Sequence, residues 1–178
     1  QALTFQMHPP TKRGAVLRPE LPSEQGRVGF YGSVAEVDGV LMMWYWAQTP
    51  YRGGAWQKGL ALATSKDGVT WTKPNLGLVP REGSKANNLV NSFGDTVSVN
   101  PLGPPEERFV LLHPKYRTDR TRGGVYLSFS PDGIHWRSHD TRVFPFVPDT
   151  QNQVRYDVAS GKWVAYLRTW HPNRRVGR

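Results

Sequence analysis

The stretch "SKDGVTW" (Ser65–Trp71) returns as "SPDGIHW" (Ser130–Trp136), 65 residues further along the chain. Each copy combines an Asp-Gly turn with a tryptophan three residues after the glycine. The aspartate can accept hydrogen bonds from backbone amides of the turn, and the glycine supplies a positive φ at little steric cost. The tryptophan can fold back over the turn onto neighbouring structure. The pattern therefore predicts a structural role for Asp67 and Asp132, and it marks a repeat.

The repeat extends well beyond the turn. "GLALATSKDGVTW" (59–71) and "GVYLSFSPDGIHW" (124–136) are identical at six of thirteen aligned positions. Each copy is preceded by an apolar run and, before that, by a short alternating run that ends in a turn. The apolar runs span residues 41–47 and 108–113, and the alternating runs span residues 32–39 and 95–103. Each unit is thus expected to be a four-stranded antiparallel sheet whose outer strand begins at the tryptophan after the Asp-Gly turn.

A third unit begins with "NQVRYDVASG" (152–161) and "KWVAYLRTW" (162–170), and the sequence reaches Arg178 before a third Asp-Gly turn of this kind. Four-stranded sheets repeated at a near-constant period are typical of β-propeller blades. The Asp-Gly turns correspond to the Asp-boxes on the outer rim of such folds. We therefore expect an all-β chain that forms about two and a half blades, the N-terminal fragment of a five-bladed propeller.

The expected organisation divides the chain into two parts. Residues 1–20 form an N-terminal extension, and residues 21–178 form the partial propeller. Within it, blade 1 spans about residues 24–80, blade 2 about 87–147, and an incomplete blade 3 residues 149–178.

Composition narrows the function classes. The chain has 18 Gly, 15 Pro and 21 aromatic residues in 178, which favours short strands and many turns. It has no Cys, so a disulfide framework and a Cys-based zinc site are excluded. The net charge is +9, but the basic residues are scattered apart from "KYRTDRTR" (115–122) and the terminal "NRRVGR". We read them as a solvated surface and expect no nucleic-acid partner, no membrane-spanning helix and no cofactor. No signal peptide is visible, and the oligomeric state stays open.

Catalytic candidates come from the 14 carboxylates by elimination, because most of them lie in hairpin turns or polar loops. Asp95 and Asp149 each lie at the entrance to the first strand of a unit, and Glu24 is the nearest equivalent in the first unit. First strands line the central channel of a propeller, so these carboxylates are expected to converge. Glycoside hydrolysis requires one carboxylic acid to protonate the leaving oxygen and one carboxylate as base or nucleophile.

Other residues are candidates for binding a sugar. Asn152 is in register with Asp95, so its amide could hold a hydroxyl group, and Arg168 could hold a carboxylate or a hydroxyl group. Trp44, Trp46 and Trp170 could stack on sugar faces, although packing between blades is the commoner role of such aromatics. The five His residues lack metal-ligand spacing, so no metal site is expected.

The series "MMWYWAQ", "SKDGVTWTKPNLGLV", "GSKANNLV" and "DTQNQVRYDVASGKWVAYLR" resembles five-bladed propeller enzymes of glycoside hydrolase families 32 and 43, and in particular uncharacterised bacterial family 32-like proteins. The resemblance covers roughly residues 20–178. It implies a carbohydrate substrate and a secreted or periplasmic location. It also implies that Asp149 matches the aspartate that stabilises the transition state in family 32.

The match departs from that family at three points. Asp149 is flanked by Pro148 and Thr150 where the family has Arg-Asp-Pro, and the Asn-Asp-Pro nucleophile motif has no match at 28–34. The family's acid glutamate, expected in a later blade, would fall after Arg178 or have been lost. Three hypotheses stay open: a glycosidase with paired carboxylates, a non-catalytic carbohydrate-binding propeller, and a six-bladed sialidase-like protein with Asp-boxes. The third requires an arginine cluster that the sequence does not clearly offer.

Overall fold

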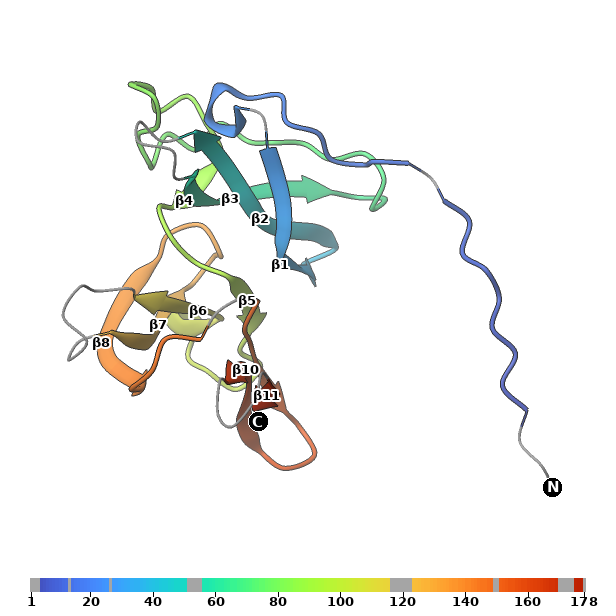
Figure 1. Ribbon diagram of the computed structural model, residues 1–178, viewed down its shortest axis with the longest axis vertical. Helices are drawn as coiled ribbons and strands as arrows, with labels where there is room; N and C mark the ends of the chain where they lie inside the picture. Colours follow the sequence, from blue (N-terminus) through green and yellow to red (C-terminus); the bar gives the residue numbers. More distant parts are fainter. Residues whose placement is uncertain are drawn as a thin grey trace.

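The computed structural model describes residues 4–12, 14–25, 27–50, 56–115, 123–148, 151–169 and 175–177. These residues form β-strands in three antiparallel sheets and two short 3-10 helices, η1 (Pro22–Glu24) and η2 (Pro105–Glu107) (Figure 1). The all-β prediction is confirmed, and the arrangement agrees with part of a propeller. None of the helices in the described ranges is long and apolar enough to cross a membrane.

The first sheet has the order β1-β2-β3-β4, with bounds Arg27–Val37, Val40–Pro50, Trp56–Ser65 and Leu89–Asn91. The sequence predicts an outer strand directly after Trp71, but only Thr72 pairs there, in a single bridge to Thr64. Pro74 follows, and proline has no N–H to donate to a ladder. The outer strand β4 therefore lies further along the chain, and the first sheet extends past its expected end near residue 80.

The second sheet has the order β5-β6-β7-β8, with bounds Thr96–Val99, Phe109–Lys115, Gly124–Ser130 and Arg137–Phe144. Here the outer strand β8 directly follows Trp136, as the sequence predicts. The third sheet has the order β11-β10-β9, with bounds Arg175–Gly177, Lys162–Thr169 and Gln153–Asp157. In each sheet the first strand in the chain lies at one edge.

The two Asp-Gly turns have the hydrogen bonds that the sequence predicts. Asp67 Oδ1 accepts from Val69 N at 2.8 Å and from Thr70 N at 2.7 Å, and Gly68 has φ +73°. In the second turn, Asp132 Oδ1 accepts from two backbone amides at 2.8 Å each, and Gly133 has φ +75°. Both aspartates are engaged within their own turns, which supports a structural role for them.

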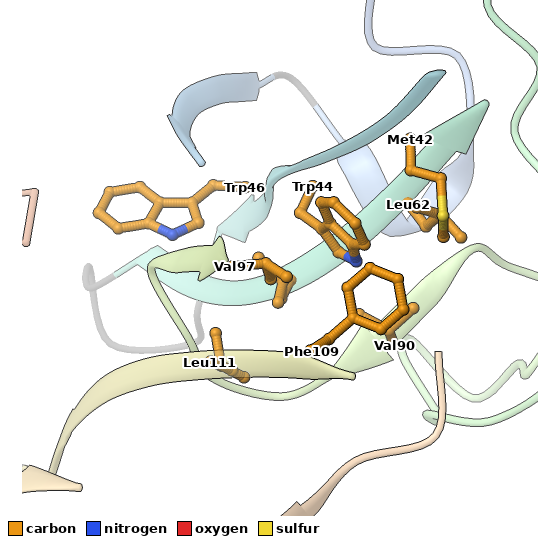
Figure 2. Close-up of a cluster of buried hydrophobic side chains, with 9 residues drawn as sticks. Met42, Trp44, Trp46, Leu62, Val90, Val97, Phe109 and Leu111 are labelled. Carbon is orange, nitrogen blue, oxygen red and sulfur yellow. The ribbon is translucent and has the colours of Figure 1, made fainter. Parts of the chain in front are cut away.

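A buried apolar cluster joins the first two sheets (Figure 2). Trp44 of β2 is fully buried, and its ring centroid lies 5.7 Å from that of Phe109 in β6. Its indole Nε1 donates to Gly133 O at 2.8 Å, so the second turn also anchors the first sheet. A second cluster, which includes Leu112, Val125 and Val154, joins the second and third sheets. The three sheets therefore pack in chain order.

The N-terminal segment has a different character. Residues 4–12 form no strand and are exposed, and Figure 1 shows this segment running away from the sheets. Leu17 packs against an apolar cluster on the outer face of the first sheet.

Candidate functional site

The first strands of the three sheets, β1, β5 and β9, lie next to one another. The hydroxyl of Ser33 in β1 accepts a hydrogen bond from Val97 N in β5 at 2.7 Å. Thr96 Oγ1 of β5 donates to Asn152 O, directly before β9, at 2.5 Å. These links hold the three strands together at one side of the sheets, as expected of strands that surround a common axis.

Three residues mark comparable positions along these strands. Asp95 and Asn152 directly precede the first paired residues of β5 and β9. Gly32 directly precedes Ser33, where the pairing of β1 with β2 resumes after an irregularity. Gln151 Nε2 donates to Gly32 O at 3.2 Å, so the third sheet reaches the first one here. A Cβ atom at Gly32 would lie 1.8 Å from Trp44 O, so this position admits only glycine. At these three positions the first sheet therefore contributes backbone, and the second and third contribute side chains.

The side chain of Asn152 connects Asp95 to the third sheet. Its Nδ2 donates to Asp95 Oδ2 at 3.4 Å, and its Oδ1 accepts from Arg168 N at 3.4 Å. Asn152 is fully buried, while Asp95 and Arg168 are 5% and 8% exposed. The structure thus brings Asp95, Asn152 and Arg168 together. We call these three residues, with Gly32, Tyr31 and Lys58, the Asp95 site.

Burial raises the pKa of Asp95 to about 6, although the hydrogen bond from Asn152 and the positive charge of Lys58 act in the opposite direction. A carboxyl group that loses its proton near pH 6 is still partly protonated close to neutral pH. Such a group can donate a proton to a leaving oxygen, which an ordinary aspartate cannot do efficiently at that pH.

Asp149 lies outside the described residues, as does Trp170. The described chain resumes at Gln151, directly before Asn152. The prediction for Asp149 therefore stays a prediction, and it concerns a position three residues before Asn152 in the sequence.

Glu24 lies in a separate buried network. Its Oε2 accepts from Lys73 Nζ at 2.8 Å and from the backbone amides of Glu20 and Leu21, and its Oε1 accepts from Tyr45 OH at 2.5 Å. Burial alone would raise the pKa of Glu24, but these hydrogen bonds outweigh it and keep the pKa below its usual value. In the described part of the chain, no hydrogen bond joins Glu24 to Asp95. The geometry favours a structural role for Glu24 over the expected catalytic one.

Two of the three tryptophans considered for sugar stacking, Trp44 and Trp46, lie in the core. Trp44 is fully buried, and Trp46 is 9% exposed. Trp46 Nε1 donates a hydrogen bond to Gly94 O at 2.9 Å. Lys58 Nζ lies 3.9 Å from the centroid of the Trp46 ring. The ring centroid of Tyr31 lies 4.7 Å from that of Trp46. Tyr31 itself is 41% exposed, so it is the aromatic ring that the site offers to a ligand.

Sequence reasoning missed Tyr31 and Lys58. A signal for Tyr31 was its position directly before Gly32. Lys58 has no local signal, because only the pairing of β3 with β2 places it beside Trp46.

A buried histidine adjoins the site. His113 lies opposite the start of β5. Its Nε2 atom is 3.1 Å from Ser128 Oγ, within hydrogen-bond distance. The centroid of its ring lies 4.5 Å from that of Phe93. Burial lowers the pKa of His113 to about 4, with a smaller effect from Lys115, so its imidazole is neutral at pH 7. Neither this cluster nor any other group of His, Asp and Glu among the described residues could hold a metal ion.

No family model matches the chain, and no curated protein matches it. Among solved structures, the chain is similar to sucrose-6-phosphate hydrolase from Lactobacillus gasseri, with TM-score 0.53 and 17% identity over 72% of this chain and 24% of that one. It is similar to a glycosyl hydrolase from Bacteroides ovatus, with TM-score 0.51 and 14% identity over 76% and 42%. A third structure, described as a glycoside hydrolase, has TM-score 0.54 and 15% identity over 82% and 51%. The chain spans between a quarter and about half of these proteins and shares the fold of that part.

Proposed function

We propose that the chain forms three neighbouring blades of a five-bladed propeller that hydrolyses a glycosidic bond of a carbohydrate. The observation that carries the proposal is the carboxyl group of Asp95. It is buried where three first strands meet, and burial raises its pKa to about 6. The similarity to solved glycoside hydrolases supports the proposal at the level of the fold.

In this mechanism, Asp95 protonates the leaving oxygen. Its pKa allows it to hold a proton near neutral pH and to release it to the glycosidic oxygen in the transition state. Asn152 orients the carboxyl group through its Nδ2, because its Oδ1 is already held by the backbone of Arg168. Hydrolysis also requires a second carboxylate, and we propose Asp149 for that role on the basis of its sequence position.

The test compares glycoside hydrolysis by the purified full-length protein and by three variants, with a panel of 4-nitrophenyl glycosides and oligosaccharides as substrates. Asp95→Asn and Asp149→Asn should each lower kcat by about a hundredfold or more. Asp140→Asn is the matched control, since Asp140 is exposed in β8, and this variant should retain full activity. Wild-type activity in Asp95→Asn would contradict the role of Asp95.

One observation favours a second candidate, a carbohydrate-binding propeller without catalysis. Tyr31 is exposed and directly precedes Gly32, whose carbonyl oxygen accepts a hydrogen bond from Gln151 Nε2. An aromatic ring with a neighbouring amide can bind a sugar without acid–base chemistry. This candidate predicts sugar binding with no release of product by the wild-type protein. The sialidase-like alternative requires an arginine cluster, and within the described ranges Arg168 is the arginine of the Asp95 site.

A further inference from the structure

Positive charge lies beside the carboxyl group of Asp95. Lys58 is exposed at the start of β3, and its ammonium group is held 3.9 Å from the Trp46 ring centroid. The same Trp46 donates to the carbonyl of Gly94, the residue directly before Asp95. In the described part of the chain, Lys58 forms no ion pair. Its charge is therefore available to a ligand.

Further cations flank the same position. Lys115, at the end of β6, lies 4.1 Å from the ring centroid of Tyr126, which pairs with His113 across the strands. Arg168 donates its backbone amide to Asn152 from the other side. The strand ends around Asp95 thus come from three sheets, and each sheet brings a basic residue.

Charge differs between the two ends of the strands. At the opposite end lie the hairpin and Asp-Gly turns, which carry five of the described carboxylates: Asp38, Asp67, Glu107, Asp132 and Asp157.

We propose that the Asp95 site takes a sugar that carries a negative charge, as a carboxylate or a phosphate, and that the ammonium group of Lys58 recognises this charge. This inference rests on the proposed function, because it names the substrate class of the same site. An exposed cation over an aromatic ring keeps most of its attraction for an anion, and neighbouring cations attract anionic ligands over a longer range.

The charge of the substrate also fits the role of Asp95. When Asp95 holds its proton it is neutral, so the described side chains of the site then carry no negative charge opposite Lys58. A substrate anion would supply that charge. A neutral sugar would leave the cation uncompensated, so the site discriminates by charge.

Binding is measured first, because it does not depend on catalysis. Calorimetry compares a hexuronic acid, the corresponding hexose 6-phosphate and the neutral hexose, each in gluco, galacto and manno configuration, with the full-length protein. We expect at least one anionic sugar to bind on the order of tenfold more tightly than its neutral counterpart. The two anionic arms distinguish a carboxylate from a phosphate. Equal or tighter binding of every neutral sugar, or no binding of any anionic sugar, would overturn the inference.

Two lysine variants locate the charge that is recognised. Lys58→Met should remove the preference for the anionic sugar and leave affinity for the neutral one within about twofold. Lys162→Met, at the opposite end of β10, is the matched control and should retain the preference. Retention of the preference in Lys58→Met would contradict the assignment to Lys58. If the protein binds the anionic sugar through Lys58 but cleaves no glycoside, the proposed hydrolysis fails while the charge recognition stands.

Discussion

The pKa of the Asp95 carboxyl group depends on its surroundings, and Asn152 is the neighbour whose hydrogen bond lowers it. The hydrogen bond from Asn152 Nδ2 stabilises the charged form of Asp95 and so lowers its pKa. Asn152→Leu removes that donor, and the pKa of Asp95 should then rise above about 6. If the protonated form is the active one, the fall in kcat/KM on the alkaline side moves to higher pH. The pH dependence of kcat/KM for wild type and variant measures this shift, and a shift to lower pH would contradict the assignment of Asp95 as the acid.

The carboxylate of Glu24 holds the entry to β1 in place. Glu24→Gln removes the charge opposite Lys73 and places an amide near backbone donors, which should cost about 3 kcal/mol of unfolding free energy. The depressed pKa of Glu24 also means that its contribution to stability is present above its usual pKa of 4.5 and is lost as the pH falls further. Urea denaturation at pH 7 measures the loss.

Activity per folded molecule separates the two possible roles of Glu24. A structural residue leaves kcat nearly unchanged once the fraction folded is taken into account. A loss of kcat by about a hundredfold or more at unchanged stability would instead restore Glu24 as a catalytic residue. The sequence could not distinguish these roles, because the partners of Glu24 are distant in the chain. Tyr45 and Lys73 lie 21 and 49 residues away, and no local pattern around Glu24 predicts contact with them.

The two Asp-Gly turns look alike in sequence, but only the second packs tightly against a tryptophan of another sheet. Gly68 and Gly133 have φ of +73° and +75°, so alanine is strained at both, by about 1–2 kcal/mol. A Cβ at Gly133 would also lie 2.6 Å from Trp44 Cζ2, whereas at Gly68 its nearest contact is Leu41 at 3.4 Å. Gly133→Ala should therefore cost about 1–3 kcal/mol more than Gly68→Ala in thermal or urea denaturation. Equal losses would show that the contact of the second turn with the first sheet contributes little.

Strand positions followed from the sequence wherever the repeat was regular. Period and alternation located the strands before both turns and β8, and they placed Asp95 and Asn152 in register. The outer strand of the first sheet was not predictable, because β4 pairs with β3 after a proline-containing connection of more than twenty residues. Lys58 and Tyr31 were missed for the related reason that their neighbours come from other strands.

The three sheets share their cores, so they should unfold together. Phe109 is 1% exposed between the first and second sheets and contacts Trp44. Phe109→Ala should lower the free energy of unfolding by about 3–5 kcal/mol. Urea transitions followed by tryptophan fluorescence and by far-UV circular dichroism should stay coincident. Two separate transitions would indicate that the sheets are independent units.

The account depends most on the claim that a sugar binds where β1, β5 and β9 meet. The most direct measurement is a crystal structure of the Asp95→Asn variant, which should not turn over its ligand, with a bound oligosaccharide. We predict that the glycosidic oxygen lies about 3 Å from the side chain of residue 95, with Asn152 and Tyr31 in contact with the sugar. An oligosaccharide bound elsewhere, for example at the Asp-Gly turns at the opposite end of the strands, would contradict the assignment of the Asp95 site.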